Sequence, residues 1–224
     1  MNLTTVVLTC DSYSKYLNNF VKLYDKYFKF PNRKIIVTEN LKQEYTDYEC
    51  VLYGNIPWGK RFQNVLDIID TDYVFVLFED YYLSQTLDQN MVTTLLNFAE
   101  SNNVDKLTLH TGAAPANIPM IFENNKTIDF CNLKFKKLSN TSNWLASTQP
   151  SFWKKSHLQF ILEENYTPWD FELIGAKKIF GKQNTIYYLD IQNEIYFNLL
   201  RRGRQLLANG WEDFLKKENL TLPQ

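Results

Sequence analysis

An apolar run that stops at two adjacent carboxylates is the feature that most constrains the fold of this chain. Residues 73–80 read Tyr-Val-Phe-Val-Leu-Phe-Glu-Asp, so the run stops at Glu79 and Asp80. Because polar residues do not alternate with apolar ones, the run predicts a strand buried on both faces, as in a parallel sheet. Open α/β sheets bind ligands outside the carboxyl ends of their strands, so we expect both carboxylates at such a crevice.

The first half of the chain alternates strand and helix patterns. Strands are expected at 5–9, 33–38, 50–53, 73–80 and 106–110, and helices at 13–28, 58–69 and 87–102. This alternation predicts an α/β fold with a Rossmann-like, mostly parallel central sheet flanked by helices. No Gly-x-Gly-x-x-Gly pattern follows the first strand and no P-loop pattern occurs, which argues against a classical dinucleotide or Walker site.

The second half is less regular. Residues 111–130 are expected to be a loop, and residues 139–150 are rich in Ser, Thr and Asn. Helices are expected at 154–164, 168–180, 191–207 and 211–217, with a strand at 185–189. Since no repeat or flexible linker occurs, residues 1–224 are interpreted as one domain with two halves, about 1–110 and about 111–224.

Composition narrows the class of protein. With 45% hydrophobic residues in 224, the chain can bury a sizeable core, and a net charge of −1 argues against a nucleic-acid partner. The three cysteines are too widely spaced to indicate a disulfide framework or a metal site. The first ten residues lack a signal-peptide pattern, and no apolar stretch approaches 18 residues. A cytoplasmic location is therefore expected.

The carboxylates at the end of the strand favour one kind of chemistry. Hard cations such as Mg²⁺ or Mn²⁺ take one or two protein carboxylates and complete their shell with substrate phosphates and water. Glu79 and Asp80 could thus handle a nucleoside diphosphate through a divalent ion. The alternative is a pair of solvated or capping carboxylates at a strand end.

Three more segments give the chain a family resemblance. Cys10-Asp11-Ser12 follows the first strand, Gln149-Pro150-Ser151-Phe152-Trp153 lies in the second half, and Pro168-Trp169-Asp170-Phe171-Glu172 comes after it. In this order, with the acidic strand end, they resemble GT-A type glycosyltransferases, in particular small bacterial enzymes that build surface polysaccharides. The resemblance covers residues 5 to about 205 and implies a nucleotide-sugar half followed by an irregular acceptor-binding half.

One position departs from the family pattern. The GT-A signature is Asp-x-Asp or a variant at the end of a central strand, and this chain has Phe78-Glu79-Asp80 there. Asp80 matches the last acidic position, whereas Phe78 stands at the first. The resemblance implies a divalent cation, Mn²⁺ or Mg²⁺, held by Asp80 with Glu79, or else an enzyme that depends less on metal.

An inverting sugar transfer needs a base that takes the proton of the acceptor hydroxyl. Asp170 and Glu172 are the candidates, since they fall in the half that the resemblance assigns to the acceptor. Thr167-Pro168-Trp169-Asp170 also fits a helix capping box, in which Asp170 would serve as a cap. Glu172 is not part of this capping box. The alternative to a catalytic role for Glu172 is an exposed position on the helix surface.

The remaining candidates bind donor and acceptor. Asp11 is expected near the ribose or base, or simply in a turn. Cationic side chains suited to the leaving diphosphate are Lys60, Arg61, Arg201, Arg202 and Arg204, whose alternative role is at a solvated helix end. The acceptor is assigned to Gln149, Trp153 and Trp169 by the resemblance.

The sequence therefore predicts a glycosyltransferase that moves a sugar from a nucleotide donor, a UDP-sugar in the first instance, to a glycan or lipid-linked glycan hydroxyl in bacterial surface polysaccharide synthesis. A sugar-phosphate nucleotidyltransferase and a non-catalytic nucleotide-sugar or glycan-binding module remain alternatives. A lipid-linked acceptor would place the protein at the inner face of the membrane. The last predicted helix, with Trp211, Phe214 and Leu215 beside Lys216 and Lys217, either touches that surface or docks on the protein body.

Overall fold

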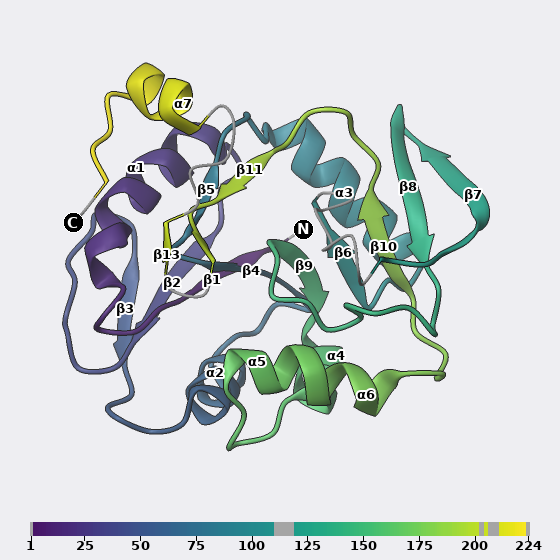
Figure 1. Ribbon diagram of the computed structural model, residues 1–224, viewed down its shortest axis with the longest axis horizontal. Coiled ribbons are helices and arrows are strands. Elements are labelled where there is room, and N and C mark those ends of the chain that lie inside the picture. The colour runs from purple at the N-terminus through teal and green to yellow at the C-terminus, as the bar shows by residue number, and fades with distance from the viewer. Residues whose placement is uncertain (1, 110–118, 202–203, 206–210, 223–224) are drawn as a thin grey trace.

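A computed structural model describes residues 2–109, 119–201, 204–205 and 211–222. The strands of its main sheet are β1 (Thr4–Leu8), β2 (Arg33–Thr38), β3 (Glu49–Leu52), β4 (Tyr73–Phe78), β6 (Lys106–Thr108), β7 (Phe122–Phe130), β8 (Leu133–Leu138), β9 (Ser151–Lys154) and β10 (Ile186–Leu189). Within the described residues they form a nine-stranded sheet in the order β3-β2-β1-β4-β9-β6-β10-β8-β7 (Figure 1). All of these strands except β8 and β9 run in one direction, so the predicted mostly parallel sheet is confirmed.

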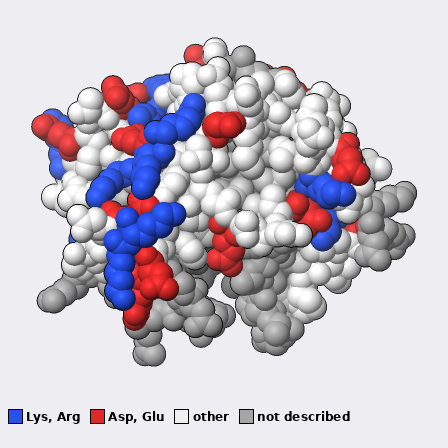
Figure 2. Space-filling view, turned by 90° about the horizontal axis from the view of Figure 1, so that it is seen from above, with Lys and Arg blue, Asp and Glu red and all other residues white. Residues whose placement is uncertain are grey.

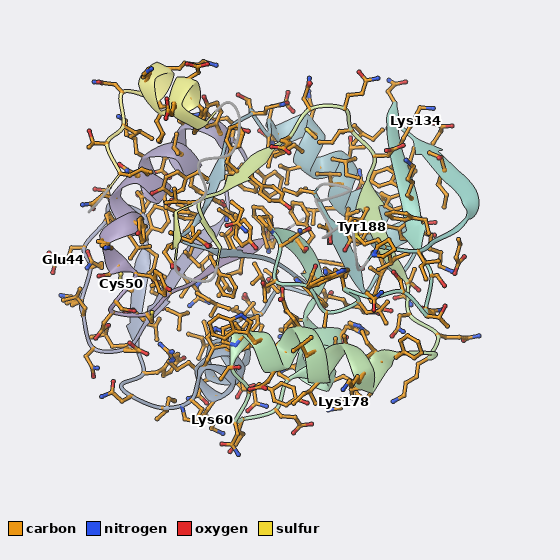
Figure 3. All side chains as sticks on the ribbon, viewed as in Figure 1. Glu44, Cys50, Lys60, Lys134, Lys178 and Tyr188 are labelled. Atoms are coloured by element: carbon orange, nitrogen blue, oxygen red, sulfur yellow. The ribbon has the colours of Figure 1, made fainter. Side chains whose placement is uncertain are left out.

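Helices cover both faces of this sheet, as the strand-helix alternation predicts. On one face lie α1 (Leu17–Tyr27), preceded by the short turn η1 (Ser14–Tyr16), and α3 (Gln89–Ser101). On the other lie α2 (Trp58–Asp67), α4 (Lys155–Ile161) and one continuous helical segment made of α5 (Pro168–Asp170), η2 (Phe171–Gly175) and α6 (Ala176–Ile179) (Figure 1). Side chains fill the space between helices and sheet (Figure 3).

The central strand β4 is buried on both faces, as predicted. Phe75 and Leu77 pack into the core beneath α1 and α3, whereas Val74 and Val76 pack into the core beneath α2 and α4. Successive side chains of a strand point to opposite faces, so a strand between two helical layers needs apolar residues at every position.

Two predictions for the second half are wrong. Residues 122–130 of the expected loop form β7, which pairs with β8 as a hairpin. The helix expected at 191–207 is absent from its described residues, which instead form β11 (Tyr196–Asn198), β12 (Leu200–Arg201) and β13 (Arg204–Gln205). β11 pairs with β5 (Tyr81–Leu83), so an available strand edge decided the conformation rather than the helical spacing of apolar residues.

The last helix, α7 (Trp211–Glu218), docks on the protein body. Phe214 is buried, and the Glu218 carboxylate accepts hydrogen bonds from the Tyr27 hydroxyl at 2.5 Å and the Lys26 ammonium at 2.6 Å. On the face shown in Figure 2, most basic side chains lie beside carboxylates, in keeping with the near-zero net charge. In the part of the chain that the structure describes, no helix has the length and apolar character needed to cross a bilayer.

Candidate functional site

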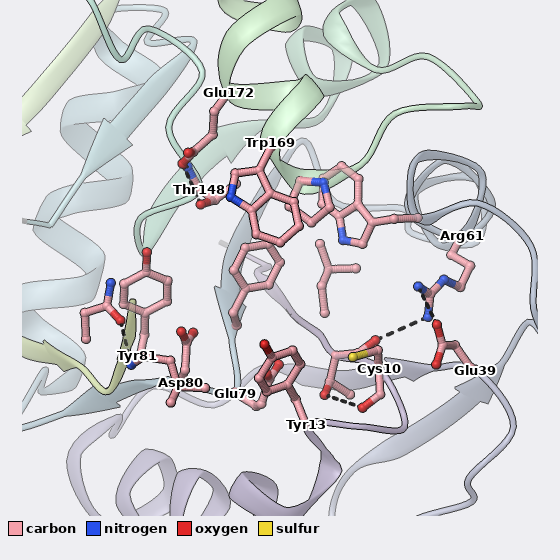
Figure 4. A pocket seen from close by; sticks show the side chains of 17 residues that line it. Cys10, Tyr13, Glu39, Arg61, Glu79, Asp80, Tyr81, Thr148, Trp169 and Glu172 are labelled. Atoms are coloured by element: carbon pink, nitrogen blue, oxygen red, sulfur yellow. Dashed lines mark hydrogen bonds and ion pairs between the residues drawn. The ribbon is translucent and has the colours of Figure 1, made fainter. Parts of the chain in front are cut away.

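A pocket of about 390 Å³ opens where the carboxyl ends of β1 and β4 meet. The two strands pair in parallel with Leu8 opposite Phe78, so the residues that follow each strand are neighbours. Both halves of the chain contribute to the lining, which consists of Leu8, Thr9, Cys10, Tyr13, Glu39, Trp58, Arg61, Phe78, Glu79, Asp80, Tyr81, Thr148, Pro168, Trp169, Glu172, Asn198 and Leu200 (Figure 4).

The acidic turn between β4 and β5 forms the floor of this pocket. Glu79 is 5% exposed, and burial, together with the nearby Asp80, raises its pKa well above the usual range. Burial likewise raises the pKa of Asp80, to about 7. The Asp80 Oδ1 atom is buried without a hydrogen-bond partner among the described residues. A buried carboxylate oxygen of this kind is unfavourable unless a ligand or cation satisfies it.

The donor set of this turn fits a divalent cation shared with a substrate. No cluster of three or more metal-ligating side chains occurs within the described residues. A complete protein cage is not needed for Mg²⁺ or Mn²⁺, since one or two carboxylates with substrate phosphates and water suffice. Asp80, with its unsatisfied oxygen, and the adjacent Glu79 supply that number of carboxylates.

Arg61 forms a second charged element of the wall. Its side chain is 7% exposed, and its guanidinium pairs with Glu39 at 3.1 Å and donates to the Thr9 carbonyl at 3.3 Å. The helix that carries it is fixed by its first turn, where the amides of Gly59 and Lys60 donate to the carbonyls of residues 166 and 164 at 2.9 Å each. Carbonyl groups of the second half thus satisfy helix-terminal amides that no side chain caps.

Asp11 shapes the loop after β2 instead of lining the pocket. Its carboxylate accepts hydrogen bonds from the amides of Leu41 and Asn40 and from the Thr38 hydroxyl. The Leu41 amide contributes most to holding the pKa of Asp11 below its usual value. The backbone amide of Asp11 donates to the Glu39 carboxylate at 3.0 Å. Asp11 therefore helps to position Glu39, the ion-pair partner of Arg61.

The position of Glu172 in the pocket depends on β9, which is antiparallel to its neighbours β4 and β6. Ser151 at the start of β9 pairs with Val76 near the end of β4, which brings Thr148, three residues before Ser151, to the same edge. The amide and the hydroxyl of Thr148 both donate to Glu172 Oε1 at 2.7 Å. Among the described residues, both hydrogen bonds to this carboxylate are made at Oε1 and not at Oε2. Glu172 and Thr148 lie across the pocket from Glu79 and Asp80 (Figure 4).

Aromatic side chains form the wall between these two groups. Trp169 is 63% exposed and lines the pocket, whereas Trp58 packs edge-on against Phe62 and Phe78. An exposed indole at a pocket mouth offers a flat face to a sugar ring or a base.

Several predicted site residues lie elsewhere. Asp170 completes the capping box with Thr167, whose amide and hydroxyl both donate to it. Lys60 pairs with Glu164 at the lower edge of the molecule (Figure 3). Trp153 is 1% exposed and packs against Phe171 in the core, so in this structure it cannot contact an acceptor.

The rest of the predicted residues are not placed in the pocket. Gln149 follows Thr148, but its side chain is not among those that line the cavity. Arg202 lies outside the described residues, and so do the side chains of Arg201 and Arg204. Their predicted contacts with the diphosphate stay predictions.

The sequence did not point to Glu39, Thr148, Tyr13 or Asn198. Glu39 follows the end of β2 as Asp11 follows the end of β1, so the strand-end rule that selected Asp11 could have selected it too. Thr148 and Asn198 carry no such signal. They reach the pocket through the antiparallel strand β9 and the pairing of β11 with β5, neither of which was predicted.

Comparison with known proteins shows which solved structures have a similar fold. No protein-family model matches the chain, and no curated protein is similar to it in sequence. Solved structures of Staphylococcus aureus TarS residues 1–349, a GT-A glycosyltransferase, are similar in fold. The complex with UDP-GlcNAc gives a TM-score of 0.63 at 15% identity over 96% of this chain and 64% of that one.

The complex of the same TarS fragment with UDP gives a TM-score of 0.59 at 13% identity, over 88% of this chain and 59% of that one. The chain thus spans about 60% of the length of the TarS structures that it matches. At this level of identity the likeness concerns the fold, and it confirms the GT-A-like fold that the sequence motifs implied.

Proposed function

We propose that the protein is a glycosyltransferase that uses a nucleotide-sugar donor, with a UDP-sugar as the first candidate. One observation carries the proposal: a buried acidic turn with an unsatisfied carboxylate oxygen faces a second, independently held carboxylate across one pocket. The first group suits a diphosphate with its cation, and the second suits an acceptor hydroxyl. The GT-A-like fold and its likeness to TarS in complex with UDP-GlcNAc support the same class of reaction.

Each group then has a defined task. Asp80, with Glu79, would hold a divalent cation, which when bound neutralises charge on the donor diphosphate. Glu172 accepts the proton of the acceptor hydroxyl on Oε2, while the two hydrogen bonds from Thr148 fix the orientation of its carboxylate. Trp169 provides a stacking face at the mouth of the pocket. The ion pair between Arg61 and Glu39 shapes the wall near β1.

Donor binding is tested by titration with UDP in the presence and absence of Mn²⁺. Asp80→Asn is expected to weaken UDP binding in Mn²⁺ at least tenfold, about 1.4 kcal/mol. Asp70→Asn is the matched control, because Asp70 is an exposed carboxylate just before the start of the same strand. If UDP binds the wild-type protein under neither condition, the donor assignment is wrong.

Catalysis is tested by donor hydrolysis across UDP-, GDP- and CMP-sugars. Glu172→Gln is expected to reduce turnover about 100-fold or more, the usual contribution of a general base, and to leave donor affinity within twofold. An Asp80→Asn variant with full activity on every accepted donor would refute the role of the acidic turn. Tight UDP-sugar binding without any turnover, also with glycan acceptors present, would instead favour a binding module.

A further inference from the structure

One surface of the protein carries more exposed apolar side chains than its fold requires. The helical segment from α5 to α6 buries Phe171, Gly175 and Ile179 against α4 and the sheet. Its outward side should therefore be polar. It carries instead Trp169 at 63%, Leu173 at 61% and Ile174 at 47% exposure, and Phe180, 53% exposed, follows its last turn.

Helix α4 extends this surface. Phe160 is 48% exposed, and the ammonium groups of Lys178 and Lys182 lie 5.1 and 5.2 Å from the centre of its ring. We refer to Phe160, Trp169, Leu173, Ile174 and Phe180, together with the lysines among them, as the apolar-basic face. Most of the large apolar side chains exposed on the described part of the protein belong to it.

The charges of this face have one sign in excess. Lys177, Lys178 and Lys182 lie on or directly after α6, and Lys178 pairs with Glu163 at 2.6 Å. Glu164 is paired with Lys60, whereas Asp170 keeps its negative charge within the capping box, so Lys177 and Lys182 face this one remaining carboxylate. Lys177 and Lys182 therefore add positive charge at the border of an apolar strip, where long lysine side chains can bring their ammonium groups to a charged surface.

We propose that the apolar-basic face docks on the surface of an anionic lipid membrane. Tryptophan, phenylalanine and leucine side chains beside lysines on one helix side are typical of helices that lie in the membrane interface. The face is too small for a stable protein dimer, because its five apolar side chains and the lysines among them are far fewer than the roughly 20–30 residues per side of a standard interface. Apolar contact and lipid-headgroup charge together suit a surface of this size.

Docking in this way has a geometric consequence for the pocket. Trp169 belongs both to the apolar-basic face and to the lining of the pocket. The pocket mouth would therefore lie beside the lipid headgroups. The described part of α7 does not compete for this role, since Phe214 and Glu218 hold it on the body.

The proposal is tested by co-sedimentation with vesicles of phosphatidylcholine containing 30% phosphatidylglycerol, compared with pure phosphatidylcholine. The wild-type protein is expected to bind the anionic vesicles and to release as salt is raised. Leu173→Ser with Ile174→Ser should weaken binding at least tenfold, and Lys177→Glu with Lys182→Glu should remove the preference for anionic lipid. The matched control is Leu52→Ser with Ile68→Ser, at positions exposed by 42% and 45% on other elements.

Thermal melts show that each variant is folded before binding is compared. Equal binding of the Leu173 and Ile174 double variant and the wild-type protein would overturn the proposal, as would absence of wild-type binding. A dimer that the double variant abolishes, seen by sedimentation in protein that does not bind vesicles, would assign the face to self-association and would also overturn it.

Discussion

A buried lysine behind the pocket should make the stability of this protein depend on pH in a calculable way. Lys106 in β6 is fully buried, and its ammonium donates to the hydroxyl and the carbonyl of Ser147 at 2.6 and 3.0 Å. Its nitrogen lies 4.8 Å from the centre of the Trp153 ring. Lys106 has no ion-pair partner among the described residues, and burial lowers its pKa from 10.5 to about 7. The turn that it holds leads directly to Thr148, the partner of Glu172.

The sign and size of the effect follow from this pKa. Between pH 7 and 10.5 the unfolded state binds a proton at Lys106 that the folded state has released, so stability rises with pH through that window. The slope approaches about 1.4 kcal/mol per pH unit, and the whole effect is about 5 kcal/mol. Below pH 7 both states are protonated and the contribution becomes constant.

The assay is urea unfolding of the wild-type protein and Lys106→Met from pH 6 to 9.5. Methionine cannot titrate, so the difference in the free energy of unfolding should change by about 3 kcal/mol over this range in favour of the wild-type protein as pH rises. The loss of the hydrogen bonds to Ser147 adds a pH-independent offset, which leaves the slope unaffected. Lys134→Met, at a largely exposed lysine of β8, should give a flat difference. A flat difference for Lys106→Met as well would refute the reasoning.

Two further substitutions test how the pocket walls are held. Asp170→Ala removes the capping box with Thr167 and should lower the urea midpoint of unfolding, with UDP affinity unchanged. A 100-fold loss of turnover at unchanged stability would instead make Asp170 the base. Gly59→Ala would place Cβ 2.1 Å from the carbonyl oxygen of Glu163 and should lower the free energy of unfolding by more than about 3 kcal/mol. Gly181→Ala, where φ is +71° but space is open, should cost only about 1 kcal/mol, and equal losses would contradict the packing argument.

Local pattern was sufficient for the first half of the fold. β1, β2, β4, α1, α2 and α3 form where apolar periodicity predicts them, because each spans enough residues for its period to be distinct. The capping box at Thr167 was also predictable, since it depends on residues three apart in the sequence. The burial of β4 between two helical layers was predictable as well, because its apolar run is uninterrupted.

Long-range pairing decided what local pattern could not. β9 has four residues, too few to show a period, and its place between β4 and β6 depends on partners that lie 43 to 81 residues earlier in the sequence. The segment 196–198 became a strand because the edge of β5 was available to it. Trp153 was assigned to the acceptor from its motif, yet it is a core residue, since the motif cannot tell which face of β9 is covered.

The same distinction between local pattern and long-range pairing applies to the residues of the candidate site. The sequence by itself determined that Glu79 and Asp80 stand at the carboxyl end of a buried strand, because an apolar run that stops at two charges has few other ways to fold. It also placed Asp170 and Glu172 together as two equal candidates for the base. Only the tertiary structure separated them: the helix start engages Asp170, whereas the reversed direction of β9 brings Thr148 to Glu172 and holds that carboxylate opposite Asp80. Contacts across 24 residues and between strands of opposite direction depend on the whole sheet, and no local pattern encodes them.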